Sequence, residues 1–205
     1  MKWQLDHLAV CAATLAEGVD YVENLLGVAL APGGQHPHMG THNRLLSLGP
    51  DAYLEVIAID PQAKSPGRPR WFDLDNFTGA PRLTNWILRT DDLMAALAGA
   101  PAGLGELMAL QRGDLSWEMA VPKDGRLPFD GAYPGLISWH GDAHPAARLP
   151  DSGFRLRALR VQHPAANDLK DLLEPNIDLT QIDFATGAVK KLSASISGPN
   201  GDVVL

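Results

Sequence analysis

The sequence has little that would cross-link the chain, span a membrane or serve secretion. Its 205 residues include one cysteine, Cys11, which rules out an internal disulfide framework and is expected to be a small buried side chain. The chain has no apolar run of about eighteen residues, the minimum for a membrane helix. It also lacks the basic and apolar blocks of a signal peptide. We therefore expect a cytoplasmic protein without a membrane partner.

Positive charge is also scarce. The chain has 17 Lys and Arg against 24 Asp and Glu, a net charge of −7, whereas a nucleic-acid groove needs a basic surface. There is no glycine-rich phosphate loop, nucleophile elbow or Cys-x-x-Cys motif. Apolar residues are abundant at 45%, enough for one substantial core or two small ones. These features favour a globular protein that binds a small molecule.

The first sixty residues alternate between the periods of strands and of a helix. Residues 3–12 follow the two-residue period of a strand, with His7 on one face and Asp6 on the other. Residues 53–59 form another strand, with Leu54 on one face and Glu55 on the opposite one. Between these strands we expect a helix, a loop with a possible short strand, and a strand near residues 41–49.

The helix has signals at both ends. Thr14 and Glu17 form a capping box, and Gly27 stands where a C-terminal glycine belongs. Its apolar stripe consists of Leu15, Val19, Val22 and Leu26. If this stripe covers the Leu54 face of the sheet, Glu55 points to the concave side, and His7 does so too if its strand belongs to the same sheet.

Two segments between and beside these elements have less definite patterns. The loop of residues 28–39 contains His36-Pro37-His38, which could bind metal, although an exposed flexible loop is the commoner explanation. The proline-rich linker of residues 61–82 contains Trp71 and Phe72, which we predict to be buried on the body or partly over the cleft.

The element order of the first unit recurs. Residues 83–141 again predict a strand, a short helix and three strands, a repeat in pattern rather than in letters. Residues 154–205 predict an abbreviated third unit, in which Ala158 falls where His7 does. We expect one domain over residues 1–205, with modules at 1–60 and 83–141.

Several motifs together resemble a known family. They are Asp6-His7-Leu8, Gly40-Thr41-His42-Asn43, Leu45-Leu46-Ser47-Leu48-Gly49, Tyr53-Leu54-Glu55-Val56-Ile57-Ala58, Pro134 through Trp139, and His144-Pro145-Ala146. The sequence resembles the glyoxalase-like domain proteins of the vicinal oxygen chelate superfamily, which includes glyoxalase I, extradiol dioxygenases and bleomycin-resistance proteins. The resemblance implies an α+β fold of paired βαβββ modules, with curved mixed sheets around a cleft.

The resemblance also implies a site. A divalent metal ion (Zn, Fe, Mn or Ni) would be held by His7, Glu55 and, from the second module, His140, and Glu55 could also act as the catalytic base. The chain has Ser138 where an acidic residue is commonly expected in this family. The loss of that carboxylate would weaken a metal site. The substrate-binding candidates are His42, Asn43, Trp117, Ser138 and His144.

Two classes of function fit these features. The first is a metal-dependent lyase, isomerase or dioxygenase that acts on a small oxygen-rich organic substrate. The second is a metal-free protein of the same fold that binds or sequesters a small molecule. A cleft-facing His7–Glu55 hydrogen bond without metal would fit the second. The sequence leaves the oligomeric state open, a homodimer included.

Overall fold

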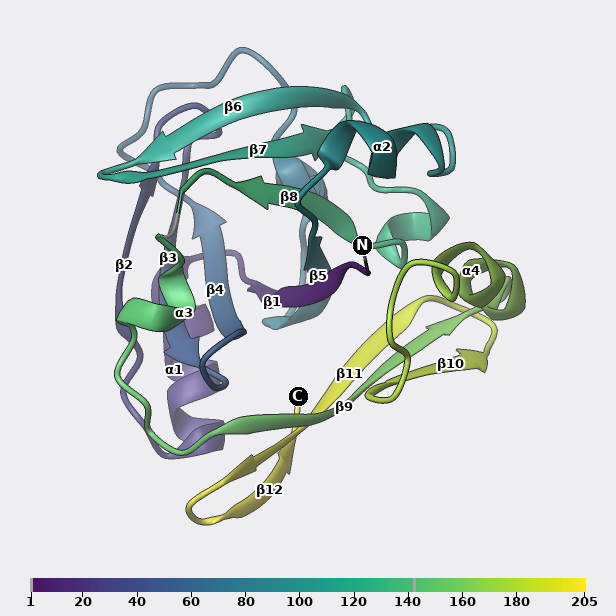
Figure 1. Cartoon of the computed structure of the whole chain (residues 1–205). Coiled ribbons are helices and arrows are strands. Elements are labelled where there is room, and N and C mark those ends of the chain that lie inside the picture. The colour runs from purple at the N-terminus through teal and green to yellow at the C-terminus, as the bar shows by residue number, and fades with distance from the viewer. Residues whose placement is uncertain (1, 142) are drawn as a thin grey trace.

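The computed structural model describes residues 2–141 and 143–205 (Figure 1). The first module contains one helix and four strands. They are β1 (Gln4–Cys11), α1 (Leu15–Leu26), β2 (Ala31–His36), β3 (Thr41–Ser47) and β4 (Tyr53–Ile59). Within the sheet, these strands lie in the order β2-β3-β4-β1, and β1 pairs with β4 in parallel.

Helix α1 has the boundaries that its end signals predict. The Thr14 side chain accepts a hydrogen bond from the Glu17 backbone N–H, the Glu17 carboxylate accepts one from the Thr14 N–H, and Gly27 ends the helix in the left-handed conformation. The helix packs closely on β4, since a Cβ added at Gly18 would lie 2.6 Å from the Val56 side chain. Glu55 therefore points away from the helix, as predicted.

The second module repeats this arrangement. It consists of β5 (Arg82–Arg89), α2 (Leu93–Ala98), β6 (Glu106–Arg112), β7 (Leu115–Val121) and β8 (Gly135–Trp139). Its strands lie in the order β5-β8-β7-β6 with β5 parallel to β8, and antiparallel pairing of β1 with β5 joins the two halves into one eight-stranded sheet. This arrangement confirms the predicted α+β fold of paired βαβββ modules.

The C-terminal part forms a separate sheet. After α3 (Pro145–Arg148) come β9 (Arg155–His163), α4 (Ala166–Leu173), β10 (Ile182–Thr186), β11 (Lys191–Gly198) and β12 (Gly201–Val204). The strand order is β10-β9-β11-β12, with β9 parallel to the strand that directly follows its helix. In the modules the first strand is parallel to the last one instead. The tail therefore shares the modules' element order but not their strand pairing.

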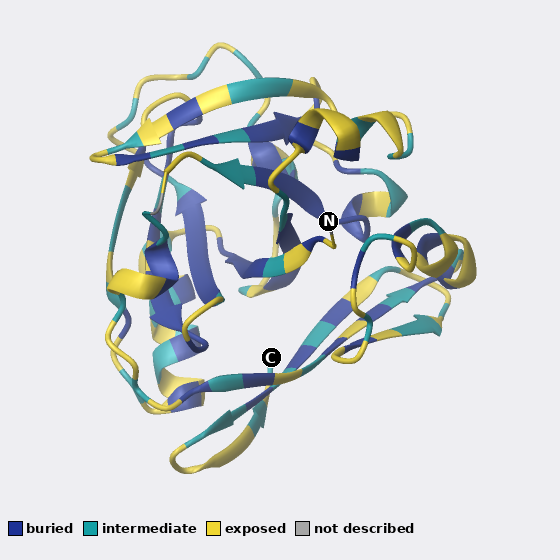
Figure 2. Ribbon diagram, viewed as in Figure 1, coloured by how far each residue is buried: buried dark blue, intermediate teal, exposed yellow. Residues whose placement is uncertain are grey.

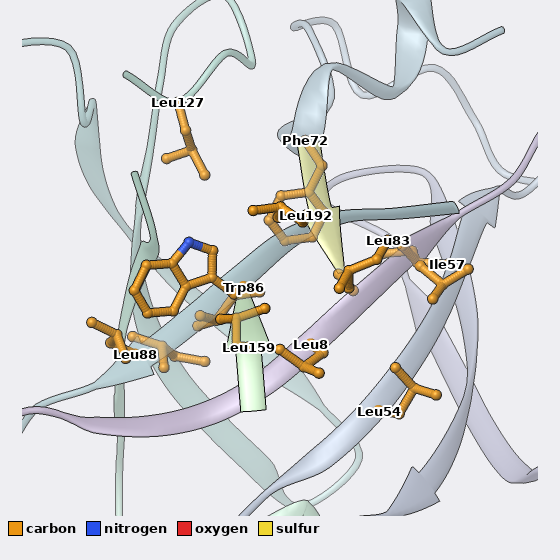
Figure 3. Close-up of a cluster of buried hydrophobic side chains, with 14 of the residues drawn as sticks. Leu8, Leu54, Ile57, Phe72, Leu83, Trp86, Leu88, Leu127, Leu159 and Leu192 are labelled. Atoms are coloured by element: carbon orange, nitrogen blue, oxygen red, sulfur yellow. The ribbon is translucent and has the colours of Figure 1, made fainter. Parts of the chain in front are cut away.

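The core lies between the layers. The eight-stranded sheet curls around a concave side, and the four-stranded sheet packs on the middle of its outer surface, where β11 contacts β5 (Figure 1). Central strands such as β4 are almost wholly buried (Figure 2). Leu8, Leu83 and Trp86 of the large sheet gather with Leu159 and Leu192 of the small one (Figure 3). Burial of this apolar surface is the main force that holds the layers together.

The linker packs on the body. Two short 3-10 helices, η1 (Trp71–Asn76) and η2 (Phe129–Gly131), lie outside the sheets. Trp71 is 5% exposed and Phe72 is 8% exposed, which confirms their predicted burial. Cys11 is fully buried, also as predicted. In the described part of the chain, no helix is long and apolar enough to cross a membrane.

Candidate functional site

A small cavity lies on the concave side of the large sheet, with walls from both modules and the linker. The first module contributes His7, His36, Asn43, Tyr53 and Glu55, and the second contributes Arg112, Trp117, Met119, Ile137 and Trp139. Trp71 and Phe72 of the linker complete the lining. The volume of about 30 Å³ leaves room for about two water molecules. Polar groups from the first module thus face mainly aromatic and apolar walls from the second.

His7 and Glu55 meet in this cavity. Strands β1 and β4 run in parallel with His7 opposite Tyr53 and Ala9 opposite Glu55, so all these side chains share the concave face. The distance between His7 Nε2 and Glu55 Oε2 is 3.6 Å. The His7 ring also stacks on Tyr53, with ring centroids 4.6 Å apart. Both side chains are about 5% exposed, so the carboxylate needs the polar partners it has here.

A bulge in β1 brings Asp6 to the same place. Alternation along a regular strand predicts Asp6 on the face opposite His7, but Leu5 pairs with Leu88 while His7 pairs with Ile87. Asp6 is therefore the extra residue of a β-bulge, and bulges re-aim side chains. Its Oδ1 lies 2.6 Å from His7 Nδ1.

Three donors converge on the fully buried Asp6. Trp139 Nε1–H donates to Oδ2 at 2.9 Å, and His144 Nε2 lies 2.9 Å from the same oxygen. His144 Nδ1 accepts from the Ala146 N–H, so its Nε2 carries the proton that Asp6 accepts. Burial alone would raise the pKa of Asp6, but the hydrogen bonds from His144 and His7 hold that pKa well below its usual range. An ionised Asp6 requires a proton on His7 Nδ1, which leaves His7 Nε2 facing Glu55 and the cavity.

Asn43 holds the other oxygen of Glu55. Its Nδ2 donates to Glu55 Oε1 at 2.5 Å, while its Oδ1 accepts from the Gly34 N–H at 2.8 Å. The backbone donor fixes the orientation of the amide. Gly33 permits this close approach, because a Cβ at that position would lie 2.1 Å from Asn43 Oδ1. The Gly33-Gly34 pair therefore shapes the carboxylate site.

His36 and Arg112 join opposite ends of the sheet. His36 is at the end of β2 and is buried, whereas His38 is exposed; the expectation of an exposed loop is thus wrong for His36. Curling of the sheet brings β6 against β2, and Arg112 donates from Nη1 to Asn43 Oδ1 at 3.2 Å and lies 3.4 Å from His36 Nε2. Burial, and then the Arg112 charge, lower the pKa of His36 to about 3. His36 is therefore a neutral acceptor.

Some of the remaining predicted residues lie at the cavity, and others lie on the opposite side of the sheet. Trp117 lines the cavity. His144 does not, but it contacts Asp6 and packs edge-on against the cavity-lining Trp139 ring, with centroids 5.4 Å apart. Ile137 and Trp139 are the residues of β8 that face the cavity, so alternation puts Ser138 and His140 on the opposite side. His140 Nε2 lies 3.8 Å from Glu118 Oε2 on that outer surface, and its side chain is 54% exposed. His42, beside Asn43 on β3, likewise faces away from the cavity.

Trp71 lines the cavity and brings a donor that lacks a partner in the described part of the chain. Its ring contacts His36 edge-on, with centroids 5.2 Å apart. Its buried Nε1–H has no hydrogen-bond acceptor among the described residues, a situation that costs about 1–3 kcal/mol. An acceptor atom of a bound ligand would satisfy it. Alternation along the strands does not predict that Arg112, Asp6 or the Trp71 donor belongs to the site. The position of Arg112 depends on closure of the sheet, that of Asp6 on the bulge, and that of Trp71 on packing of the linker.

The donor set does not fit a complete metal site. His7 Nε2 and Glu55 Oε2 are suitable ligand atoms, but protein metal centres usually take at least three protein ligands. No group of three His, Cys, Asp or Glu with suitable geometry occurs in residues 2–141 and 143–205. The cavity-facing side chains of β7 and β8 are Trp117, Met119, Ile137 and Trp139, none of which is a good ligand for the expected ions.

Comparison with known protein families identifies the family of this chain. The family model described as "Glyoxalase-like domain" matches residues 5–176. The chain belongs to the glyoxalase-like domain family. Its paired modules are those of the vicinal oxygen chelate superfamily, as the resemblance predicted. No curated protein matches the glyoxalase-like chain.

Several solved structures are similar to this chain at low sequence identity. A hypothetical protein from Staphylococcus aureus has a TM-score of 0.64 and 15% identity, over 93% of this chain and 88% of that one. A methylmalonyl-CoA epimerase variant from Streptomyces coelicolor, in complex with 2-nitronate-propionyl-CoA, has a TM-score of 0.45 and 14% identity over 70% of this chain and 100% of that one. The Mycobacterium tuberculosis methylmalonyl-CoA epimerase has a TM-score of 0.43 and 20% identity over 68% and 88%.

Proposed function

We propose that this glyoxalase-like protein is an enzyme that moves a proton at a carbon next to a carbonyl group, in a small oxygen-rich organic substrate. This is isomerase or lyase chemistry. The observation that carries the proposal is the buried His7–Glu55 pair, with 3.6 Å between Nε2 and Oε2, inside a cavity that Arg112 and Trp71 also line. The Trp71 indole N–H has no acceptor among the described residues. Acid–base groups and an anion-binding group therefore face one small space.

Each side chain has a chemical task in this proposal. Glu55 Oε2 takes the proton from the substrate carbon. The C–H electron pair forms a double bond to the carbonyl carbon, and the carbonyl π pair moves onto the oxygen, which becomes the enolate oxygen. Arg112 and the Trp71 N–H stabilise that negative oxygen. His7 exchanges the proton with Glu55 and returns it to the substrate, while Asp6 keeps the His7 ring in the required tautomer.

A divalent metal ion is the cofactor that the family resemblance implies, and Zn, Fe, Mn or Ni would polarise the substrate oxygens when bound. His7 and Glu55 would be its protein ligands. Because the third ligand is missing from this cavity, we route no step through a metal. We expect less than about 0.1 equivalent of metal after purification without chelators or a nickel column. Stoichiometric metal that is lost in both His7→Ala and Glu55→Gln would instead support a metal-dependent enzyme.

Deuterium exchange tests the proton transfer. The protein is incubated in D2O with three-carbon 2-oxo acids and 2-hydroxy ketones, the smallest members of each class with a C–H next to the carbonyl group, and loss of the C–H signal is followed by NMR. Glu55→Gln should slow exchange about a hundredfold or more, since a positioned base contributes about 10²–10⁴. Glu118→Gln, the same change on the outer surface, should have no effect. Equal exchange rates in the wild type and in Glu55→Gln would refute the role of Glu55.

The metal-free binding protein remains a second candidate, because one observation favours it. The second module contributes only Arg112 and apolar or aromatic side chains to the cavity, a lining that suits retention of an aromatic or apolar ligand. Quenching of tryptophan fluorescence by a compound that shows no deuterium exchange would support binding without catalysis.

A further inference from the structure

A second, larger cavity lies between the two sheets. Its volume is about 850 Å³, and it is bounded by the start of β5, the linker, the loop before η2 and the start of β11. Phe72, Leu83, Leu127 and Leu192 supply apolar wall (Figure 3). Phe72 is the only one of these four that also lines the first cavity. Small-molecule sites have volumes of about 300–1,000 Å³, so this space is large enough for an organic ligand.

Lys190 brings a positive charge into this cavity. It directly precedes β11 and is half-buried, and its Nζ donates to the Thr84 carbonyl oxygen. Lys190 takes part in none of the ion pairs of the described residues. No carboxylate of those residues therefore lies within 4.0 Å of its Nζ. Burial, more than any other cause, lowers the pKa of Lys190 to about 8. The ammonium group is thus partly desolvated with no carboxylate of the described residues in direct contact, although the Asp130 charge acts on it from further away. An anion bound against Nζ would stabilise this arrangement.

Neither acidic side chain in the lining forms an ion pair with Lys190 in the described residues. Asp73 lies 3.2 Å from Arg126 Nε, and Asp130 lies 3.5 Å from His163 Nε2. Arg82, another cation on this wall, stacks over the Phe77 ring at 4.3 Å. The cavity lining contains more cationic than acidic side chains, namely Arg82, Arg126, Lys190 and Lys191 against Asp73 and Asp130.

A glycine leaves room beside Lys190. Gly131 has a φ of +82°, and a Cβ there would lie 3.4 Å from Asn85 Nδ2 and 3.5 Å from Lys190 Nζ. Asn85 Nδ2 and Lys190 Nζ are thus neighbours beside the Gly131 backbone, and a side chain at position 131 would crowd them. Both residues line the cavity, and two neighbouring donors match the two oxygens of a carboxylate.

We propose that this second cavity binds a small organic carboxylate, with its carboxylate group against Lys190 Nζ and Asn85 Nδ2 and its apolar part against Leu83, Leu127 and Leu192. The charge selects an anion, and the leucine walls select an apolar body over a sugar or a bare phosphate. This site is separate from the His7–Glu55 pair, so it does not depend on the function proposed for that pair.

Calorimetric titration with sodium hexanoate at pH 7 tests the proposal, with hexan-1-ol as the neutral probe of the same length. Wild-type protein should bind one hexanoate per chain, and at least tenfold more tightly than hexan-1-ol. Lys190→Met should weaken hexanoate binding at least tenfold, whereas Lys190→Arg, which keeps the charge, should stay within about threefold. Lys170→Met removes an exposed lysine outside the cavity and should leave the affinity unchanged.

Three results would overturn the proposal: no hexanoate binding by wild type, equal affinity in Lys190→Met, or loss of binding in Arg112→Met, which would move the ligand to the first cavity. If Lys190→Met fails to fold, reductive methylation of the wild type gives a second measurement by mass spectrometry. Hexanoate should then slow modification of Lys190 at least fivefold and leave Lys170 unaffected. Equal modification of Lys190 with and without hexanoate would also refute the site.

Discussion

Acid should destabilise the protein through His36. The side chain is 6% exposed, and burial, followed by the Arg112 charge, lowers its pKa to about 3. In the unfolded chain the pKa of histidine is about 6.5. Between these two values the unfolded state binds the extra proton, so the free energy of unfolding falls as the pH falls. From pH 7.5 to pH 4.5, this group alone should reduce the free energy of unfolding by about 2.5 kcal/mol.

Urea unfolding, followed by tryptophan fluorescence at the two pH values, measures this loss. His36→Gln keeps a polar amide but cannot titrate, so its loss of stability between pH 7.5 and pH 4.5 should be about 2.5 kcal/mol smaller than that of the wild type. His38→Gln is the matched control, because His38 is exposed two residues further on, and it should behave as wild type. The same pH-dependent loss in His36→Gln and wild type, with unchanged m-values, would show that His36 is not kept neutral by the fold.

Three further substitutions address the site. Gly33→Ala should cost about 1–3 kcal/mol of stability in urea unfolding, because its Cβ would overlap the Asn43 side chain. Gly99→Ala, whose Cβ would come no closer than 4.0 Å to the Ala96 carbonyl oxygen, should stay within about 0.5 kcal/mol; equal effects would contradict the close approach. Asp6→Asn should slow deuterium exchange about 10–100-fold by releasing the imidazole it orients, and an unchanged rate would remove Asp6 from the mechanism. Trp71→Phe should weaken binding of an oxygen-rich substrate about tenfold in calorimetry while the fold persists; unchanged affinity would mean that the indole N–H is not a substrate donor.

Local patterns were sufficient for the paired modules and for half of the site. The capping box at Thr14 and the glycine at Gly27 set the ends of α1 because they act on neighbouring backbone groups. The same helix, through its apolar stripe, determined which face of β4 is covered. That argument put Glu55 on the concave side with His7, where the two are 3.6 Å apart.

Only the tertiary structure decided the rest. Alternation shows which residues of a strand share a face but not which face is concave, so Ser138 and His140 were expected where Ile137 and Trp139 lie. The bulge in β1 also turned the Asp6 side chain away from the face that alternation predicts.

Contacts across the whole chain are further beyond local reasoning. Arg112 reaches Asn43 because the sheet curls until β6 meets β2, and Lys190 reaches Thr84 because a second sheet packs outside the first. These partners are 69 and 106 residues apart. Periodicity describes neighbours along a helix or strand, whereas such contacts depend on how entire layers pack, which no single segment encodes.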